Sequence, residues 1–403
     1  MSAIKVPVDQ QTGQHPGSSV DQQTGQRPDA SVDLRSNLAG LTLANPIAVA
    51  SGTFASGREF AQLRANQLAA DGWPGQGGMP GTGARSNGDS AQAASTSQTD
   101  NTFTGEKSER PGSLTGRPGS APDGFAPDPA PASSALLQGI GALFTKGVSF
   151  DPWPGNAGVR ITETASGMLN SIGLMNPGVE GFCANDLAWL ADCPVPVIVN
   201  VCGQKTIDYM AVIERLEDEP AVAGYELNIS CPNVCCGGMA FGTDPDAAAD
   251  VTGRCRSVTR RPLLVKLTPN ITEVSEVARA VEAAGADGIS LINTVAGMAI
   301  DIKARRPLFE RKVAGLSGPA IKPIALWAVY RVAQAVQVPL VGLGGIRTAA
   351  DVVEFMLAGA SVVAIGTDNF TQPGHVFELA DELRAWCAAE GVNDIKALVG
   401  ALE

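Results

Sequence analysis

The stretch YELNISCPN, residues 225–233, places a thiol between two amides directly after an apolar run. Pro232 disfavours the helical region for the residue before it, so Cys231 is expected to be extended where a strand gives way to a loop. The chain has two histidines, His15 and His375, and neither is near this stretch in the sequence. A thiol with the usual pKa of about 8.5 can act as a general base at mildly alkaline pH. The alternative is that Cys231 is a small buried hydrophobe, which is the usual fate of a free cysteine.

Two lysines stand at the ends of apolar, strand-like runs. Lys146 follows ALFT and Lys266 lies within LLVKL. An ammonium group in such a run is unfavourable unless an anion or a carbonyl group compensates it. Either lysine alone could extend to solvent or pair with a carboxylate. Because both stand at equivalent strand ends, we expect them to share an anionic ligand.

Glycines end the last two apolar runs, at Gly344 and Gly345 in GLGGI and at Gly366, before Thr367, in IGT. Backbone amides without side chains let phosphate oxygens approach closely. GLGGI alone is a weak signal, since glycine also serves tight turns between a strand and a helix. The run GLGGIR lacks the GxGxxG pattern of dinucleotide-binding loops. We therefore expect a phosphate group at these two loops.

Amide side chains occur at or near several strand ends, at Asn170, Asn228, Asn233 and Asn293. An amide both donates and accepts hydrogen bonds, so four amides around one cavity suit a flat, heteroatom-rich ring. Taken singly, each is more often a turn or capping residue.

The elements that would bring these residues together are short apolar runs separated by longer segments. The runs cover residues 47–52, 142–147, 197–201, 225–230, 263–267, 288–294, 339–345 and 362–367. Continuous apolar runs fit parallel strands buried on both faces, and segments such as 274–284 and 349–357 are amphipathic at helical spacing. We predict an α/β fold, a (β/α)8 TIM barrel with its active site at the carboxyl ends of the strands. An open doubly wound sheet is the alternative.

Three segments fall outside this pattern. Residues 1–30 repeat VDQQTGQHP as VDQQTGQRP and contain almost no large apolar side chain, so we expect a disordered arm. Residues 32–46 alternate in polarity around Ala39 and Gly40, which predicts a short β-hairpin. Residues 68–134 are rich in Gly, Pro, Ser and Thr and are expected to be a low-complexity insertion. The barrel domain is thus expected over residues 31–403, interrupted by the insertion.

Charge and composition limit the partners. The net charge of −12 argues against nucleic acid or an anionic membrane surface. We find no apolar run near the roughly 20 residues that cross a bilayer and no signal segment, so we expect a cytoplasmic protein with small-molecule ligands. The eight cysteines show no CxxC spacing, which disfavours a metal site.

The motifs together resemble those of the class 1 dihydroorotate dehydrogenases, FMN-dependent barrel enzymes of pyrimidine biosynthesis. The resemblance is greatest to the class 1B catalytic subunit, which passes electrons to NAD, and it extends from about Val32 to the C-terminus without the insertion. It is carried by ANPIAVASGTF, FTKGVS, MLNSIGLMNPGVEGF, ELNISCPNV, INTVAGMAIDI, GLSGPAIKPIAL, GLGGI and IGTDNF. The membrane-bound class 2 enzymes use a serine base, so the cysteine here speaks against that class.

The resemblance implies a role for each candidate residue. Cys231 would remove a proton from C5 of dihydroorotate while hydride leaves C6 for N5 of the flavin. Lys266 would lie by the N1/C2 carbonyl edge of the flavin, where negative charge collects on reduction. Lys146 would touch flavin and substrate. The substrate would be held by Asn170, Ser171, Ile172, Gly173, Leu174, Asn228, Asn233, Asn293 and Thr294. FMN would be bound by Ser51, Lys146, Gly147, Asn200, Asn228, Lys266, Ile292, Gly318, Gly344, Gly345, Gly366 and Thr367.

The resemblance also implies partners. Class 1B enzymes work with a second subunit that carries FAD and a 2Fe-2S cluster, so we expect a homodimeric core joined to such an electron-transfer subunit. Three alternatives remain open: a class 1A-like fumarate-linked enzyme, another FMN barrel oxidoreductase acting on a dihydropyrimidine, and a non-catalytic flavin-binding subunit. Ala314 stands where the family usually has the first glycine of a pair. Cys235 and Cys236 are close enough in sequence to Cys231 to permit oxidative trapping.

Overall fold

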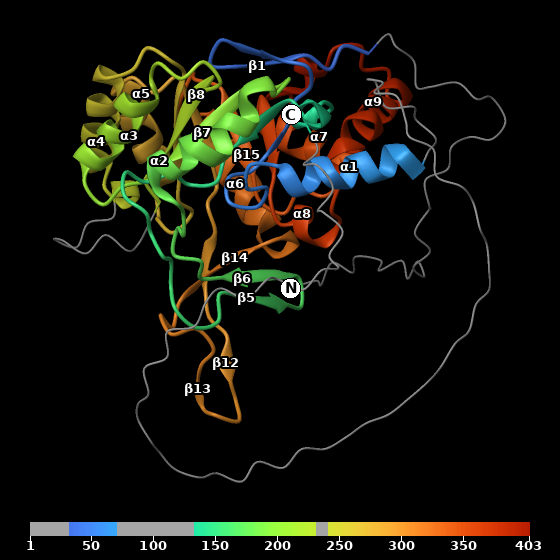
Figure 1. The fold of residues 1–403 in the computed structure, drawn as a ribbon. Coiled ribbons are helices and arrows are strands. Elements are labelled where there is room, and N and C mark those ends of the chain that lie inside the picture. Colours follow the sequence, from blue (N-terminus) through green and yellow to red (C-terminus); the bar gives the residue numbers. More distant parts are fainter. Residues whose placement is uncertain (1–31, 71–132, 231–240) are drawn as a thin grey trace, which may run out of the picture. The chain divides into compact units, whose positions relative to one another are not determined.

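The structure is a computed structural model that describes residues 32–70, 133–230 and 241–403. Its centre is a closed barrel of parallel strands in the order β10-β15-β16-β3-β4-β7-β8-β9 (Figure 1). The strands are β3 (Ile47–Val49), β4 (Ala142–Phe144), β7 (Val197–Val201), β8 (Gly224–Asn228), β9 (Leu263–Leu267), β10 (Gly288–Leu291), β15 (Leu340–Leu343) and β16 (Val362–Ile365). Every run predicted as a strand lies in this barrel, which confirms the TIM barrel over the open sheet.

The barrel strands are buried on both faces, as their continuous apolar sequences predict. Along β7, Ile198 packs in the barrel interior, whereas its neighbours Val197 and Val199 pack between the strands and the helices. Successive side chains of a strand point to opposite faces, so this alternation places the even-numbered positions of β7 inside the barrel. Asn200, near the end of the same strand, therefore also faces inward.

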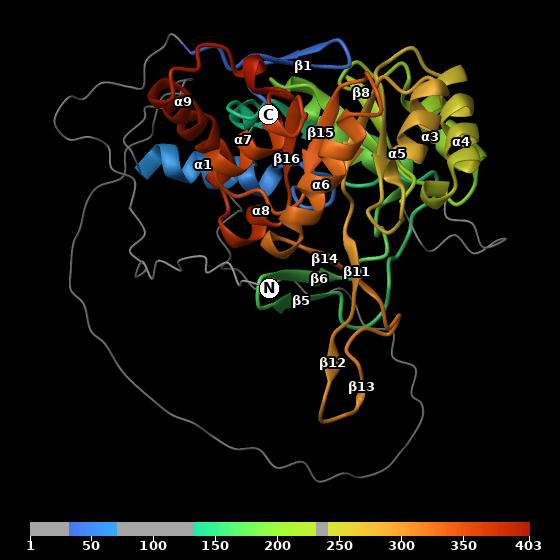
Figure 2. The same ribbon diagram turned by 180° about the vertical axis from the view of Figure 1, so that it is seen from behind.

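Helices surround the barrel (Figure 2). They are α1 (Arg58–Ala70), α2 (Gly178–Phe182), α3 (Thr206–Leu216), α4 (Pro245–Ser257), α5 (Val274–Ala283), α6 (Lys322–Ala333), α7 (Ala349–Leu357), α8 (Asp368–Thr371) and α9 (Leu379–Ala389). The helices predicted over 274–284 and 349–357 are confirmed as α5 and α7. α7 begins with a capping box, in which Thr348 and Asp351 each accept a hydrogen bond from the other's backbone N–H.

The predicted N-terminal hairpin is also confirmed. Its strands, β1 (Ser36–Leu38) and β2 (Leu41–Leu43), join through Ala39 and Gly40 at φ values of 53° and 86°, the left-handed pair of a tight two-residue turn. Leu38 and Leu43 pack against the interior side chains of the barrel. The hairpin therefore closes the amino end of the barrel and leaves the carboxyl end for the site.

A second sheet, not predicted from the sequence, lies at the carboxyl end of the barrel (Figures 1 and 2). This cover sheet is antiparallel, in the order β11-β14-β6-β5. β5 and β6 come from the segment between β4 and β7, and β11 and β14 come from the segment between β10 and β15. Its strands are β5 (Ile161–Thr164), β6 (Gly167–Asn170), β11 (Val295–Gly297) and β14 (Ala314–Ser317), and β12 (Ile300–Asp301) with β13 (Arg306–Pro307) forms a hairpin beyond it. The strands are short and partly exposed, so they carry little hydrophobic periodicity.

The expected disordered arm and most of the expected insertion lie outside the described residues. The predicted start of the insertion at residue 68 falls inside α1, which continues to Ala70. Ser134, its predicted end, begins a short 3-10 helix, Ser134–Leu137. Among the described helices, none is both long and apolar enough to span a membrane.

Candidate active site

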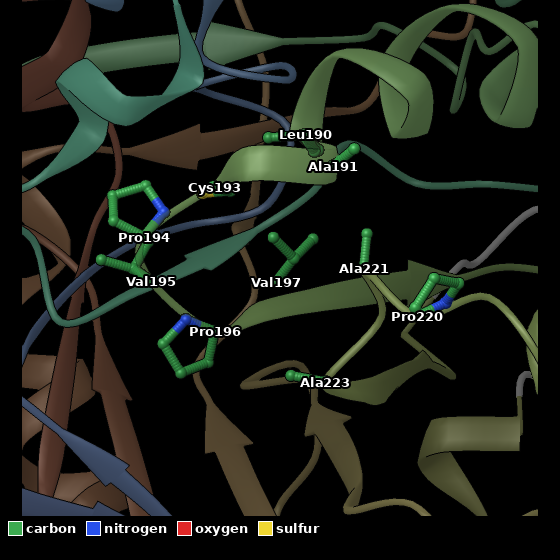
Figure 3. Close-up of a pocket in the computed structure, with 10 residues that line it drawn as sticks. All are labelled: Leu190, Ala191, Cys193, Pro194, Val195, Pro196, Val197, Pro220, Ala221 and Ala223. Atoms are coloured by element: carbon green, nitrogen blue, oxygen red, sulfur yellow. The ribbon is translucent and has the colours of Figure 1, made fainter.

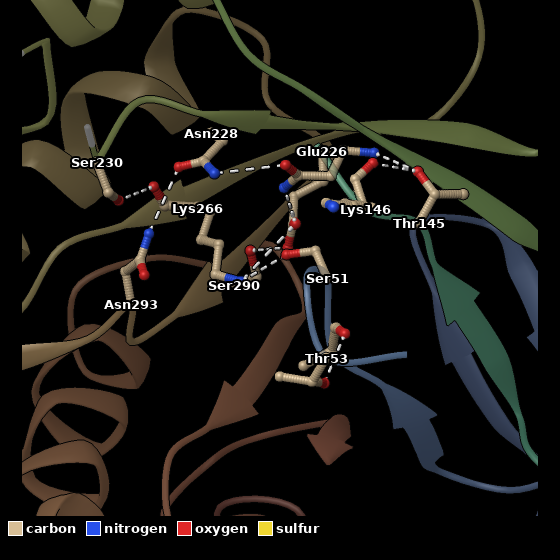
Figure 4. Close-up of polar contacts among 12 residues, drawn as sticks. Ser51, Thr53, Thr145, Lys146, Glu226, Asn228, Ser230, Lys266, Ser290 and Asn293 are labelled. Carbon is tan, nitrogen blue, oxygen red and sulfur yellow. Dashed lines mark hydrogen bonds and ion pairs between the residues drawn. The ribbon is translucent and has the colours of Figure 1, made fainter. Parts of the chain in front are cut away.

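A network of buried polar side chains lies inside the barrel at its carboxyl end (Figure 4). Glu226 of β8 is at its centre: Asn200 Nδ2 donates to Glu226 Oε2 at 2.5 Å, and Ser290 Oγ donates to Oε1 at 2.6 Å. Lys266 Nζ lies 4.0 Å from Glu226 Oε2 and donates to Ser51 Oγ at 2.9 Å. Five separate strand ends thus converge on one buried group of atoms.

The strand register explains this convergence. Asn200 of β7 pairs with Glu226 of β8, and Lys266 of β9 pairs with both Asn228 of β8 and Ser290 of β10. Residues two apart on a strand face the same side, so Glu226 and Asn228 both point inward, with Asn228 nearer the carboxyl end. Glu226 is 1% exposed and Lys266 is 5% exposed, so the carboxylate and the ammonium group are nearly removed from water.

A row of amides continues from this network towards the loops. Asn228 Nδ2 donates to Asn200 Oδ1, and Asn293 Nδ2 donates to Asn228 Oδ1, each at 3.4 Å. The Tyr209 hydroxyl donates to the carbonyl of Asn228 at 2.9 Å, which fixes the end of β8. Thr294 N donates to Asn293 Oδ1 at 2.8 Å. Two of the four amides predicted around one cavity, Asn228 and Asn293, therefore lie together, and Asn200, predicted to bind FMN, continues the row.

Lys146 and Gly147 follow β4 at the same rim of the barrel. A Cβ on Gly147 would lie 3.2 Å from Asn200 Oδ1, so this loop passes close to the amide row. Burial lowers the pKa of Lys146 below its usual 10.5, and a partly opposing attraction comes from Asp186. The Lys146 ammonium group is therefore easier to deprotonate than one in water.

The segment predicted to hold the substrate begins in the cover sheet. Asn170 ends β6, and its Nδ2 donates to the carbonyl of Gly315 at 3.3 Å instead of joining the amide row. A Cβ on Gly315 would collide with the Thr294 side chain, so Asn170 and Thr294 lie against the same backbone. Ser171, which follows β6, accepts from Asn156 Nδ2 at 3.0 Å. The segment continues as Ile172, Gly173 and Leu174, where Leu174 Cδ2 lies 3.8 Å from the Cβ position of Gly147.

Gly345 and Thr367, predicted to bind phosphate, and Gly318, predicted to bind FMN, lie where the loops after β15 and β16 meet the cover sheet. Gly318 and Gly345 have φ values of 91° and 76°, which favour glycine. A Cβ on Gly345 would lie 2.8 Å from the carbonyl oxygen of Gly318. Thr367 Oγ1 donates to Ser317 Oγ at 2.8 Å, which joins the β16 loop to the same place. Gly318, Gly345 and Thr367 are therefore brought together, and the backbone at both glycines is packed too closely to admit a side chain.

Three other residues predicted to bind FMN pack against neighbouring elements of the barrel. Gly344, beside Gly345, packs against Ala325 of α6, and Gly366 packs near Ala50. Ile292 is buried after β10, where its N–H donates to the carbonyl of Leu343 at 3.1 Å.

Cys231, Asn233, Cys235 and Cys236 lie outside the described residues. Within the described part of the chain, we find no group of three or more His, Cys, Asp and Glu side chains that could hold a metal ion.

Two residues of the network, Glu226 and Ser290, were not predicted from the sequence. Glu226 stands inside the quoted run YELNISCPN, and a carboxylate in a fully buried strand is as unfavourable as the lysine that was noticed in LLVKL. That signal was available. Ser290 gave no comparable signal, because a serine in a buried strand is common.

A hollow of about 310 Å³ lies at the other end of the barrel, at the amino ends of β7 and β8 (Figure 3). Its lining consists of Leu190, Ala191, Cys193, Pro194, Val195, Pro196, Val197, Pro220, Ala221 and Ala223. These side chains are apolar or nearly so, and they offer few groups for acid, base or ion-pair chemistry. The polar network at the carboxyl end is therefore the candidate site.

Comparison with known proteins gives consistent matches. A family model described as dihydroorotate dehydrogenase matches residues 122–386. The chain is 42% identical over 367 residues to the "Dihydroorotate dehydrogenase B (NAD(+)), catalytic subunit" of Pelobacter propionicus, a match covering 91% of this chain and 97% of that protein. It is 51% identical over 266 residues to the protein of the same name from Geotalea uraniireducens, covering 66% and 87%. A solved structure of DHODH from Eimeria tenella in complex with ferulenol has a TM-score of 0.61 at 17% identity, covering 93% of this chain and 89% of that one, which supports the fold.

Proposed function

Because the chain belongs to the dihydroorotate dehydrogenase family, and within it to the NAD-linked B type, we propose that it oxidises dihydroorotate to orotate with bound FMN, in pyrimidine biosynthesis. The observation that carries this proposal is the buried Lys266, whose ammonium group is held beside a row of amides at the carboxyl end of the barrel. A buried cation with amide donors and acceptors suits a ring that becomes negatively charged during the reaction.

The donor set fits FMN. Gly318, Gly345 and Thr367 would take the phosphate group, since backbone without side chains lets N–H groups approach the phosphate oxygens closely. Lys266, Asn200 and Ser51 would line the ring, together with Lys146, Gly147, Asn228, Ile292, Gly344 and Gly366. When bound, FMN supplies a hydride acceptor at N5. Lys266 is in place before any charge develops, so it stabilises the negative charge without reorganisation.

The chain's own residues would hold the substrate and move its proton. Asn228 and Asn293, with Asn170, Ser171, Ile172, Gly173, Leu174, Asn233 and Thr294, would bind the pyrimidine ring. Lys146 would pair with the carboxylate of the substrate, and its half-buried position strengthens that attraction. Cys231 would take the proton from C5 as the hydride leaves C6.

The names of the relatives identify a catalytic subunit of an NAD-linked enzyme, which supports a separate electron-transfer subunit for this chain. We place FAD and a 2Fe-2S cluster on that subunit, and we propose a cytoplasmic homodimer of this chain as the core of the assembly.

The test is the absorbance spectrum of the purified full chain, followed by anaerobic addition of dihydroorotate. We expect a flavin spectrum that dihydroorotate bleaches and that dihydrouracil bleaches much more slowly. The chain alone should then reduce ferricyanide with dihydroorotate but reduce NAD poorly, and fumarate should be a poor acceptor. A chain without flavin, or flavin that dihydroorotate leaves oxidised, would contradict the proposal, and rapid NAD reduction without a partner would contradict the two-subunit assignment.

A further inference from the structure

Glu226 is the most deeply buried charged group of the site, and the proposed chemistry gives it no role. It is 1% exposed, and each of its carboxylate oxygens accepts a hydrogen bond, one from Asn200 and the other from Ser290. A buried carboxylate is unfavourable unless it is paired and hydrogen-bonded. Glu226 meets this requirement, since both of its oxygens accept hydrogen bonds and Lys266 Nζ lies 4.0 Å from Oε2.

The hydrogen bonds that lead to Glu226 all run in one direction. Asn293 donates to Asn228, Asn228 donates to Asn200, and Asn200 donates to Glu226. A carboxylate can only accept, so it requires the Nδ2 group of Asn200 to face it. Asn200 Oδ1 then faces outward and becomes an acceptor for Asn228. The anion at the inner end of the row therefore determines which atom each amide presents at the next position.

Glu226 also compensates the charge of Lys266. Lys266 Nζ is held between Ser51 Oγ at 2.9 Å and Glu226 Oε2 at 4.0 Å, in a part of the barrel from which water is excluded. Opposite charges at this separation interact strongly when they are buried. Without Glu226, the full positive charge of Lys266 would act on a ligand bound at the carboxyl end of the barrel.

From this geometry we infer that Glu226 is a positioning residue for the amide row and for Lys266. This inference rests on the proposed function. It orients the amide row that binds the pyrimidine ring, and through Lys266 it lowers the reduction potential of the bound flavin. The lowered potential leaves the reduced flavin able to pass its electrons on.

The first test compares Glu226→Gln with the wild-type full chain by reductive titration against a reference dye. We expect the equilibrium constant to shift about tenfold towards reduced flavin, or ~30 mV for a two-electron couple. Glu226→Asp keeps the negative charge but places it farther from Lys266, because its side chain is one methylene shorter. It should therefore shift the potential in the same direction by a smaller amount. This variant also maintains the test if Glu226→Gln does not fold. Asp250→Asn, which removes a carboxylate paired with Arg254 on the exposed side of α4, is the matched control and should leave the potential close to that of the wild type.

The second test asks whether the effect passes through Lys266. In a Lys266→Met background, Glu226→Gln should no longer raise the potential, because the charge that Glu226 compensates is gone. A general structural role would produce the same change in both backgrounds. Glu226→Gln keeps one acceptor oxygen for Asn200, so the amide row is tested with Glu226→Leu, which offers no acceptor. Orotate binding, followed by the change it causes in the flavin spectrum, should weaken roughly fivefold to tenfold in Glu226→Leu because the amide row loses its terminal acceptor.

An unchanged potential in both Glu226→Gln and Glu226→Asp would overturn the inference, as would a rise that persists in the Lys266→Met background. These outcomes differ from a failure of the proposed function. That failure would appear in the wild-type chain itself, as the absence of bound flavin or of bleaching by dihydroorotate.

Discussion

Ser230 Oγ donates a hydrogen bond of 2.9 Å to the carbonyl oxygen of Lys266. The residue immediately before Cys231 is thereby tied to the strand that carries the buried ammonium group. In the proposed reaction, the proton leaves C5 and the hydride leaves C6 of one ring, so the base and the cation must keep a constant relative position. This hydrogen bond joins the segment after β8 to β9, the strand that carries Lys266.

Removal of this hydrogen bond should slow the chemical step more than it weakens binding. In Ser230→Ala, we expect the rate of flavin reduction by dihydroorotate to fall roughly threefold to tenfold, because small misplacements of a reacting group are costly. Stopped-flow absorbance at saturating substrate measures that rate. Ser257→Ala is the matched control, since the Ser257 hydroxyl also donates to a backbone carbonyl, at 2.7 Å within α4, far along the chain from the site. Equal rates for Ser230→Ala and the wild type would show that the tether does not matter for chemistry.

Cys231 should be required for proton removal and dispensable for flavin binding. We expect Cys231→Ala to retain the flavin spectrum while flavin reduction falls by about 10²-fold to 10⁴-fold, the usual contribution of a general base. Cys231→Ser should fall within the same range, because a serine hydroxyl is a weaker acid than a thiol and ionises less. The wild-type rate should rise with pH as the thiol ionises, and this rise should disappear in Cys231→Ala. A Cys231→Ala chain that reduces its flavin at the wild-type rate would assign the base elsewhere.

Lys146 should limit activity on the alkaline side. Burial lowers the pKa of its ammonium group below 10.5, so the positive charge is present at low pH and is lost at a lower pH than for an exposed lysine. We expect the KM for dihydroorotate to rise as pH increases through that lowered pKa, because the substrate carboxylate loses its partner. Lys146→Arg keeps a charge throughout this range and should flatten the rise if the guanidinium group is accommodated. Lys146→Ala should show a high KM at every pH, and a strong alkaline rise in that variant would implicate another group.

The barrel and much of its site could be predicted because they depend on strong local signals. Unbroken apolar runs identify buried parallel strands, and a lysine or an asparagine at the end of such a run is conspicuous. Closure of the barrel then requires Ser51, Asn200 and Lys266 to meet, although they are far apart in the sequence. The meeting of these three residues therefore follows from the order of the strands in the barrel and could be predicted without knowledge of side-chain contacts.

The cover sheet and Glu226 escaped prediction for different reasons. β5 and β6 are four residues each and are partly exposed, so no periodic pattern distinguishes them from a loop. Their order next to β14 depends on contacts between distant segments. Asn170 belongs to this sheet, where it donates to the carbonyl of Gly315, and its part in substrate binding stays a prediction. Glu226 was visible in a buried run, but its partners, Asn200 and Ser290, come from two other strands and are known only from the barrel register.

Gly345 should be essential for flavin binding because of both its backbone and its surroundings. Its φ of +76° is strained for other residues, and a Cβ would lie 2.8 Å from the Gly318 carbonyl oxygen and 2.9 Å from Lys322 Cβ. We expect Gly345→Ala to purify with little FMN, measured as the ratio of flavin to protein absorbance. Gly391→Ala is the matched control: its φ is +71°, but open space surrounds the Cβ position. That variant should lose about 1 kcal/mol of stability and keep its flavin. Equal flavin content in the two variants would show that the close approach at Gly345 is unimportant.

His375 should make the folded chain less stable at alkaline pH. Its Nδ1 lies 3.0 Å from Asp368 Oδ2 and its Nε2 lies 3.2 Å from Glu382 Oε1, while Arg347 donates to the other oxygen of Asp368 at 3.0 Å. The hydrogen bond to Asp368, with a smaller contribution from Glu382, raises the pKa of His375 to about 9. A pKa raised above the unfolded value of about 6.5 stabilises the fold fully below pH 6.5, and this stabilisation is lost as pH rises through 9.

The wild-type chain should therefore lose of the order of 1–2 kcal/mol of unfolding free energy between pH 6.5 and 9.5. This loss is smaller than the full pKa shift of His375 would give, because Glu382 is partly exposed and solvent screens its charge. His375→Gln preserves hydrogen bonding but cannot gain the charge, so its stability should change less over this interval. Urea midpoints at pH 6.5, 8 and 9.5 measure both dependences. His375→Gln should be less stable than the wild type at pH 6.5, and the two proteins should converge at pH 9.5. Parallel curves for the two proteins would mean that His375 is not the group that titrates.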